Sequence, residues 1–318
     1  MMQAFLVVLT MSFLVFSGVF LVGDPIEILV ADDADQAERE AMIKDLGLDQ
    51  PFHIQYLRFL EKAAQGDLGD SFVFDEPALQ LIVERLPATM ELAIVALLIA
   101  VIFGIPLGVI AGLKPDKVYS KFIMTSSILG FSLPTFWVGI MMILLFAVQL
   151  GWLPSTGRGD DIVYVLGFPT SVLSWDGFLH VLMPAVNLAL FKLSMVIRLS
   201  RAGTREVVHQ DYVKFARAKG LTESRIIFVH VMKNILIPVV TVLGLEFGGL
   251  VAFSVVTETV FAWPGIGKLL IDSIGFLDRP VIVAYLMIIV FLFVILNLIV
   301  DITYSILDPR VRLQDVKS

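Results

Sequence analysis

Cysteine is absent from the 318-residue chain, which excludes a disulfide framework, a thiolate nucleophile and a cysteine-based metal site. The four histidines lack metal-ligand spacing and form no legible arrangement with Ser and Asp; they are His53, His180, His209 and His230. The sequence also lacks a GxxxxGK[ST] loop, which would cradle nucleotide phosphates. We therefore expect no metal site, no catalytic residues and no cofactor bound by this chain.

Charge is scarce as well. Only 17% of the residues are charged and 58% are hydrophobic, whereas about a quarter of the residues in ordinary globular proteins are charged. The apolar residues form long runs, which is typical of helices that cross a bilayer with about 20 residues each. These runs lie at about 4–23, 88–112, 122–150, 178–200, 235–257 and 281–306. They predict an all-α integral membrane protein with about six transmembrane helices.

The runs divide the chain into a first transmembrane helix at 1–23, an extracytoplasmic helical segment at 24–86 and a five-helix core at 87–318. The first run lacks the charged n-region and the small-residue cleavage site of a secretory signal, so we expect this helix to be retained. Six crossings would place both termini on the same side of the membrane.

The distribution of Lys and Arg predicts which side that is, because short basic loops stay in the cytoplasm. One side holds the basic residues of 114–121, 198–233 and 310–317, whereas the other holds the acidic segment 24–86. We therefore expect a multi-pass protein of the cell (inner or plasma) membrane with both termini in the cytoplasm. The acidic residues that give the formal net charge of −7 lie mainly on the outer side, so we expect no nucleic acid as a partner. The expected partner of the apolar helices is the lipid bilayer.

The acidic segment shows helical periodicity twice, at 35–46 and at 51–64. Asp49 is the predicted cap of the second helix, and Pro51 stands at an early helical position. This segment has two interpretations: it packs on the bundle as a solvated cap, or it docks a partner directly.

The stretch 201–238 is basic, cytoplasmic and helical in period, and it contains the text QDYVKFARAKGLTESRIIFVHVMKNILIP. Gly220 predicts a break between two short helices at 212–219 and 222–231. Composition alone would fit a juxtamembrane helix that binds anionic lipid. The order of the residues resembles the EAA loop of ABC importer permeases, in the form used by the dipeptide, oligopeptide and nickel branch. In that family the loop, here 201–235, carries a coupling helix that docks on the ATPase subunit.

The resemblance extends over nearly the whole chain. It includes RLPATMELA, SLPTFWVG, LGWLPSTG, VVTETVFAWPGIGKLL and VDITYSILDPRVR. Two departures from the generic EAA loop fit the peptide branch: Lys214 replaces Glu, and Lys233 replaces the closing Pro, with Pro238 five residues later.

The resemblance implies a permease subunit that forms half of the translocation path for peptides or a related small solute. It implies as partners a second homologous permease, two ATPase subunits that bind ATP and Mg, and an extracytoplasmic substrate-binding protein. The cargo stays open among dipeptides, longer peptides, glutathione, nickel chelates and some oligosaccharides. The implied contacts with the ATPase are Asp211, Tyr212, Ala216, Arg217, Ala218, Lys219, Gly220 and Leu221.

Four ionisable residues fall inside predicted helices, where each charge costs about 2.5–3.5 kcal/mol to insert; they are Lys192, Glu246, Glu258 and Asp301. Glu258 and Asp301 lie near predicted helix ends, which favours interfacial positions. Lys192 precedes the predicted helix end at Ser200 by eight residues, and Glu246 follows Pro238 by eight, which places both about 12 Å into the membrane.

Two interpretations of these charges remain. Lys192 and Glu246 either approach each other or line one hydrated cavity, or else they lie on separate faces of the bundle. We assign Lys192, Glu246 and Glu258 to the translocation path. An ion-coupled secondary transporter could use the same three residues as a relay and would need no coupling loop. A membrane-embedded enzyme is disfavoured because no metal or nucleophile constellation shares one depth.

Overall fold

The computed structural model describes residues 2–22, 26, 35–45, 47, 49–165 and 167–307. The chain forms two compact units. The first contains Met1–Thr89 and Pro264–Ile295, and the second contains Met90–Trp263 and Leu296–Ser318. Two long helices, α5 (Ala78–Leu113) and α13 (Arg279–Leu307), contribute residues to both units.

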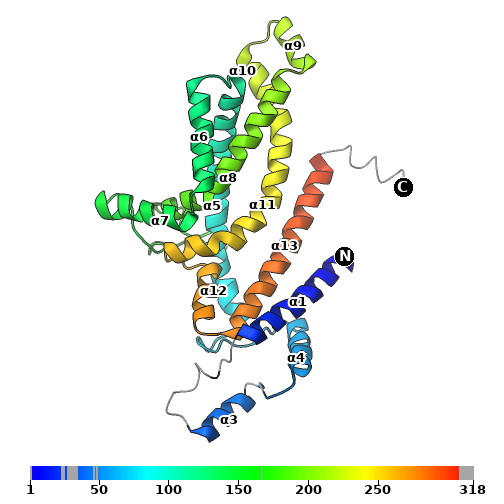
Figure 1. Cartoon of the computed structure of the whole chain (residues 1–318), viewed down its shortest axis with the longest axis vertical. Helices are drawn as coiled ribbons and strands as arrows, with labels where there is room; N and C mark the ends of the chain where they lie inside the picture. The colour runs from blue at the N-terminus through cyan, green and yellow to red at the C-terminus, as the bar shows by residue number, and fades with distance from the viewer. Residues whose placement is uncertain are drawn as a thin grey trace. The chain divides into compact units, whose positions relative to one another are not determined.

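The first unit is mainly helical in its described part, with one isolated β-bridge between Asp70 and Pro77 (Figure 1). Besides the ends of α5 and α13, its helices are α1 (Met2–Val22), α3 (Gln36–Asp45), α4 (Phe52–Ala64) and α12 (Ile266–Gly275). The helices predicted at 35–46 and 51–64 are confirmed as α3 and α4. The predicted cap is wrong: Pro51 is the N-cap residue of α4, and no side chain caps that end.

Aromatic side chains join α4 to α1. Phe13 and Phe16 of α1 contact the rings of Phe52, Tyr56 and Phe59, with centroid distances of 5.4–6.1 Å. Edge-on and tilted ring pairs of this kind are favourable beyond the area that they bury. The two helices therefore pack through one aromatic face.

A buried carboxylate anchors the segment that follows α4. Asp278, just before α13, is fully buried; it accepts hydrogen bonds from Ser71 Oγ at 2.5 Å and from the Phe72 amide at 3.2 Å. The Ile266 amide, at the start of α12, donates to Thr89 Oγ1 at 2.9 Å. The region before α5 is thus tied to the loops around α12 and is not a free tail.

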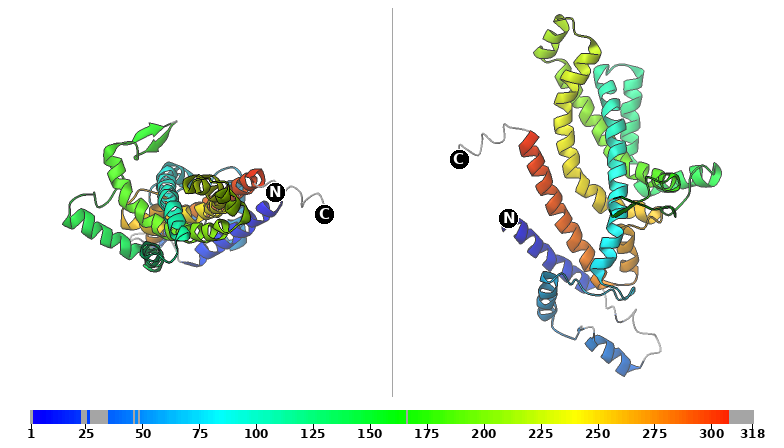
Figure 2. Two further views of the ribbon diagram at one scale, coloured as in Figure 1. Left: turned by 90° about the horizontal axis from the view of Figure 1, so that it is seen from above. Right: turned by 180° about the vertical axis from the view of Figure 1, so that it is seen from behind.

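The second unit is built mainly of long helices with one small sheet. Besides its parts of α5 and α13, its elements are α6 (Val118–Ser132), α7 (Thr135–Met142), η1 (Ile143–Gln149), β1 (Val163–Val165), β2 (Phe168–Thr170), α8 (Trp175–Val208), α9 (Asp211–Ala218), α10 (Glu223–Arg225), η2 (Ile226–Val231) and α11 (Met232–Val260). The all-α prediction missed the antiparallel hairpin β1–β2, which projects from the helices of this unit (Figure 2).

Four helices in the described part of the chain are long and apolar enough to cross a membrane. They are Ala78–Leu113, Trp175–Val208, Glu223–Val260 and Arg279–Val300. The predicted crossing at 122–150 is not one straight helix, because α6 and the α7–η1 pair are bent by 105°. Proline disfavours helical geometry in the residue before it, and Leu133 before Pro134 is extended, with φ −82° and ψ 136°. Counting the bent pair as one span gives five, and α1 adds a shorter apolar stretch, Leu6–Gly18.

Three glycines of α5 allow it to lie directly against α8. Gly104, Gly108 and Gly112 repeat every four residues and so share one helix face. A Cβ added to Gly108 would lie 2.5 Å from Ser200 Cβ and 2.6 Å from the Ile197 carbonyl oxygen. Small residues at such spacing let membrane helices approach closely.

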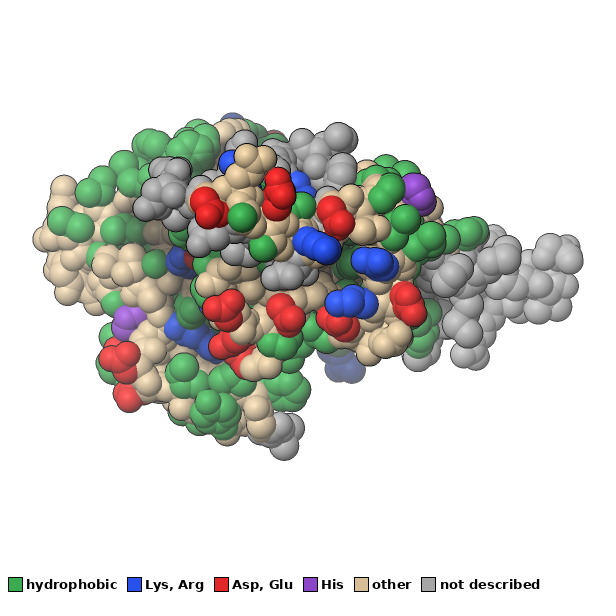
Figure 3. All heavy atoms as spheres, turned by 90° about the horizontal axis from the view of Figure 1, so that it is seen from below, with side chains coloured by type: hydrophobic (Ala, Val, Ile, Leu, Met, Phe, Trp, Pro, Cys, Tyr) green, Lys and Arg blue, Asp and Glu red, His purple; other side chains and the backbone are tan. Residues whose placement is uncertain are grey.

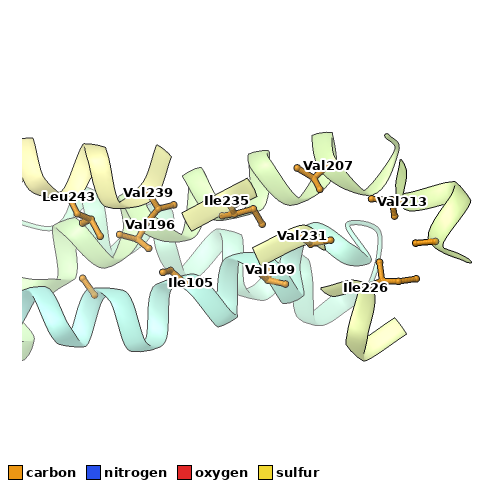
Figure 4. Close-up of a cluster of buried hydrophobic side chains, with 12 residues drawn as sticks. Ile105, Val109, Val196, Val207, Val213, Ile226, Val231, Ile235, Val239 and Leu243 are labelled. Carbon is orange, nitrogen blue, oxygen red and sulfur yellow. The ribbon is translucent and has the colours of Figure 1, made fainter. Parts of the chain in front are cut away.

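A cluster of buried aliphatic side chains continues from this contact to the end of the unit that carries α9. It joins α5, α8, α9, η2 and α11 (Figure 4). Its labelled members are Ile105, Val109, Val196, Val207, Val213, Ile226, Val231, Ile235, Val239 and Leu243. The short helix α9 is therefore part of the packed unit.

The α5–α8 contact predicts that Gly108→Ala lowers the apparent melting temperature of the purified protein. The added methyl group meets backbone at 2.6 Å, and overpacking of this kind costs about 1–3 kcal/mol. Gly275→Ala is the matched control, because a Cβ at Gly275 meets nothing within 4 Å. Equal melting temperatures for the two variants would contradict a close contact between α5 and α8.

Candidate functional site

The helix α9 presents two different faces. Val213 and Ala216 are buried, at 0% and 5% exposed, and belong to the aliphatic cluster. Phe215 and Tyr212 lie on the outward side, at 61% and 43% exposed. Residues three apart share a helix face, which explains both pairs. The helix is thus held by one face, while its other face exposes aromatic side chains.

A left-handed glycine ends α9. Gly220 has φ +79°, its amide donates to the Arg217 carbonyl at 2.9 Å, and the Leu221 amide donates to the Ala216 carbonyl at 3.2 Å. These two bonds form a Schellman motif, and Leu221 packs against the aliphatic cluster as that motif favours. The break predicted at Gly220 is confirmed.

The second predicted helix, 222–231, is not a separate element. It begins as α10 and continues through η2 into α11, so that Glu223–Val260 is one helix of 38 residues. No helix-breaking residue occurs between Thr222 and Pro238, and Pro238 lies inside α11. The membrane-crossing helix therefore begins before its predicted start, five residues after the end of α9.

Ion pairs order the surface of α9. Arg217 donates from Nε to Glu223 Oε1 at 2.8 Å and from Nη2 to Glu223 Oε2 at 3.3 Å, which links α9 to the start of α10. The hydrogen bond that Arg217 donates to Glu223 raises the pKa of the Arg217 guanidinium above its ordinary value. Lys214 Nζ donates to Asp211 Oδ1 at 2.9 Å, and this bond lowers the pKa of the Asp211 carboxyl. Lys219 lies over the Phe215 ring, 4.6 Å from its centroid.

Two of the eight predicted contact residues differ from the rest. Ala216 is buried in this chain's own aliphatic cluster and faces inward with Val213, so that little of its surface is open to a partner. Leu221 is half-buried. The exposed members are Asp211, Tyr212, Arg217, Ala218, Lys219 and Gly220. Phe215 was missed, although its spacing of three residues from Tyr212 places it on the same outward face.

Lys192 on α8 and Glu246 on α11 form an ion pair. The Lys192 side chain is 9% exposed and that of Glu246 is 39% exposed. Gly249 lies beside both charged groups, since a Cβ there would lie 3.8 Å from Lys192 Nζ and 3.9 Å from Glu246 Oε2. The predicted approach of the two side chains is confirmed. The depths behind that prediction were measured from wrong helix ends, because α8 continues past Ser200 to Val208.

Glu258 is fully buried within the protein, two residues before the end of α11, and its interfacial position stays a prediction. Its carboxylate accepts a hydrogen bond from Ser254 Oγ at 2.8 Å, one turn earlier on α11. Glu258 is twelve residues beyond Glu246, about 18 Å along a helix, so the two do not share one cluster. The side chain of Asp301 lies outside the described residues.

A second buried ion pair was not foreseen from the sequence. Glu91 on α5 accepts from Arg158 Nε at 2.9 Å and Nη2 at 2.5 Å, and both side chains are less than a tenth exposed. The other Glu91 oxygen accepts from Thr170 Oγ1, the Ser171 amide and hydroxyl, and the Val172 amide, at 2.7–3.1 Å. One carboxylate thus holds the loop that carries the hairpin. Glu91 lies within the RLPATMELA motif, and Arg158 directly follows LGWLPSTG. No sequence spacing relates two residues that are 67 positions apart, so their pairing could not be predicted.

The described residues contain no group of three or more His, Cys, Asp or Glu side chains that could hold a metal ion. Among the described ionisable groups of the second unit, the buried Glu91, Arg158 and Lys192 are paired with opposite charges, and Glu258 accepts from a hydroxyl group. Their arrangement supports helix packing and charge compensation, and we assign no bond-breaking chemistry to them.

Comparisons with known proteins place these features in one family. Residues 104–313 match the family described as binding-protein-dependent transport system inner membrane component. Residues 1–93 match the corresponding N-terminal family of membrane components. The two matches together cover most of both compact units.

Several curated proteins are similar over almost their whole length. The chain is 42% identical to the di/tripeptide transport system permease protein DppB of Pseudomonas aeruginosa, over 92% of this chain and 90% of that protein. It is 38% identical to the oligopeptide transport system permease protein AppB of Bacillus subtilis, over 91% and 90%. It is 36% identical to the dipeptide transport system permease protein DppB of Escherichia coli, over 95% and 94%.

A solved structure shares the fold. A chain of the MetNI methionine ABC transporter, in an inward-facing conformation, aligns with a TM-score of 0.57 at 17% identity. The alignment covers 72% of this chain and 97% of that chain. At this identity the likeness shows the fold alone.

The ion pair of α8 and α11 predicts non-additive mutations. Lys192→Met and Glu246→Gln should each impair assembly or transport, because the remaining charge is left without its partner at a cost of up to about 3–5 kcal/mol. The double variant should be milder than the sum of the two losses, as measured by melting temperature and by uptake into vesicles. Lys268→Met with Asp272→Asn is the matched control, since this pair joins neighbouring turns of α12 and should contribute about 0.3–0.5 kcal/mol. Strictly additive losses at Lys192 and Glu246 would contradict the coupling.

Proposed function

The chain belongs to the family of binding-protein-dependent transport system inner membrane components, and we propose that it forms half of the translocation path of an ATP-driven importer for peptides or a related small solute. It is the membrane subunit of the transporter and not its enzyme. The sequence has no phosphate-binding GxxxxGK[ST] loop, and ATP hydrolysis belongs to separate subunits. The observation that carries the proposal is α9, a short helix fixed by its buried face with aromatic side chains turned outward.

The outward face of α9 is the docking surface for an ATPase subunit. Tyr212, Phe215, Arg217 and Lys219 supply the aromatic and cationic side chains that dominate well-packed protein interfaces. Asp211, Ala218 and Gly220 lie beside them on the exposed surface. Ala216 and Leu221 act from behind, by fixing the helix to the aliphatic cluster.

The path for the solute runs beside the paired charges of α8 and α11. Lys192, Glu246 and Glu258 are the proposed path residues, with the first two acting as a pair and Glu258 separately near the other end of α11. The partly exposed Glu246 carboxylate is the member that a passing solute would meet. The similarity to di/tripeptide, dipeptide and oligopeptide permeases supports a peptide as that solute.

The complete transporter needs further subunits. We infer a second homologous permease, two ATPase subunits that carry ATP and Mg, and an extracytoplasmic binding protein that delivers the cargo. In this multi-pass inner-membrane protein, the basic end with α9 and both termini would face the cytoplasm, as the distribution of Lys and Arg indicates.

Coupling through α9 predicts the loss of substrate-stimulated ATP hydrolysis in Phe215→Ala and Gly220→Trp. The first variant removes the most exposed aromatic ring of α9, and the second forces a bulky residue into φ +79°. We expect at least a tenfold loss in the assembled complex, while membrane insertion stays intact, because hot-spot truncations cost about 2 kcal/mol or more.

The control for this experiment is Phe276→Ala, which removes a ring that is 51% exposed in the first unit. Normal stimulation in both α9 variants would rule out the coupling assignment. Uptake by reconstituted vesicles that depends on an ion gradient and not on ATP would favour the secondary-transporter alternative.

The proposed orientation can be tested directly, because the chain has no cysteine of its own. Asp160→Cys and Asp49→Cys should react with an impermeant thiol reagent added to intact cells, since both positions are exposed on the predicted outer side. Lys219→Cys is exposed on the opposite side and should react only after the membrane is opened. Labelling of Lys219→Cys in intact cells would reverse the orientation.

A further inference from the structure

The outer segment gathers its few cations around one cavity. Between residues 24 and 86 the sequence holds 15 Asp and Glu residues but only 5 Lys and Arg. Three of these five cations line one cavity of about 370 Å³ in the first unit, namely Lys44 at the end of α3 and Arg58 and Lys62 on α4. Asp67 is the one acidic side chain among the described residues that line it. Three positive charges against one negative leave a local charge of +2 in a segment whose total is −10.

Among the described residues, the charges around this cavity are poorly compensated. Lys62 lies 3.5 Å from Asp67, but both side chains are more than half exposed, so the pair contributes little. Among the described residues neither Lys44 nor Arg58 forms an ion pair. On the face seen from below, Lys and Arg side chains lie beside one another with Asp and Glu side chains around them (Figure 3). Cations that converge in this way repel one another unless an anion lies between them.

Apolar walls adjoin the cations. Phe16 of α1 and Phe59 of α4 line the same cavity, and their rings contact each other at 5.4 Å. Neighbouring side chains of α1 are turned outward, with Leu14 56% and Phe13 47% exposed. A helix that exposes Leu and Phe in this way offers a surface for acyl chains.

We propose that this cavity binds the phosphate of an anionic phospholipid headgroup, with the acyl chains lying along α1. Arg58 matches two phosphate oxygens with its planar guanidinium, and Lys44 and Lys62 add point charges. A volume of about 370 Å³ falls within the range of small-ligand sites, about 300–1,000 Å³. The proposal is independent of the transport function, because it requires only that α1 is embedded in a bilayer.

The test is native mass spectrometry of the full transporter, titrated with phosphatidylglycerol and with phosphatidylcholine as the lipid without net charge. The wild-type protein should retain phosphatidylglycerol in preference to phosphatidylcholine. Arg58→Gln and the Lys44→Gln, Lys62→Gln double variant should each weaken phosphatidylglycerol binding about tenfold, as expected for the loss of a charge-assisted hydrogen bond. Arg58→Lys should retain part of the affinity.

The matched control is Arg39→Gln, which removes a cation of α3 that does not line the cavity. Equal binding of the two lipids, or equal phosphatidylglycerol binding in Arg58→Gln and Arg39→Gln, would overturn the proposal. Displacement of the lipid by low-millimolar inorganic phosphate would overturn lipid as the source and assign the site to free phosphate. Weakened docking of the binding protein in Arg58→Gln, with unchanged lipid binding, would overturn it in favour of a protein partner. Melting temperatures of all variants show that they are folded.

Discussion

The close contact of α5 with α8 is the constraint on which the second unit depends. At Gly104, Gly108 and Gly112 α5 has no side chain, so that backbone and side-chain atoms of α8 lie only 2.5–2.8 Å from where a Cβ would be. Apolar side chains cannot drive such an association in lipid, because lipid tails are equally apolar; close packing must do so. With α8 held in this way, α6, α7, α9 and α11 all pack around it (Figure 1).

The buried charges follow the same logic within each unit. A charge inside a membrane protein is costly unless it is paired, and each one described here has a partner. Glu91 accepts hydrogen bonds from Arg158 and four further donors, and Asp278 accepts from Ser71 and the Phe72 amide. Lys192 forms an ion pair with Glu246. These contacts join segments far apart in the sequence. They therefore specify which helices and loops are neighbours, which apolar packing leaves less determined.

Local patterns predicted the elements, and the long-range contacts lay beyond them. Apolar runs located the long helices, and the glycine at 220 located the end of α9, because both signals are properties of neighbouring residues. The bend at Pro134 had a local signal too, but the apolar run continued through it and masked the break. Ala216 is buried because residues of η2 and α8 pack against α9, and this packing cannot be predicted from the sequence of α9 alone. Glu91 and Arg158 likewise meet only through the fold.

The pairing of Lys192 with Glu246 was predictable because they lie on consecutive long helices, which are often neighbours. The same connection relates the ion pair to α9. The segment α9 is the connection between α8 and the Glu223–Val260 helix: α8 ends three residues before α9, and that helix begins five residues after it. Arg217 and Glu223 fasten α9 to the start of the helix, from which Glu246 is about 34 Å distant along the axis.

Lys192 projects from α8 and Glu246 from α11, so the ion pair joins the two helices that α9 connects. A displacement of α9 by a partner acts on both helices at once, one through its C-terminal end and the other through its N-terminal end. Packed helices resist bending and transmit such motion as a shift of one against the other. The ion pair is one of the polar contacts between α8 and α11, together with the hydrogen bond from Asn187 to Thr257, so a shift of one helix against the other would act on both contacts.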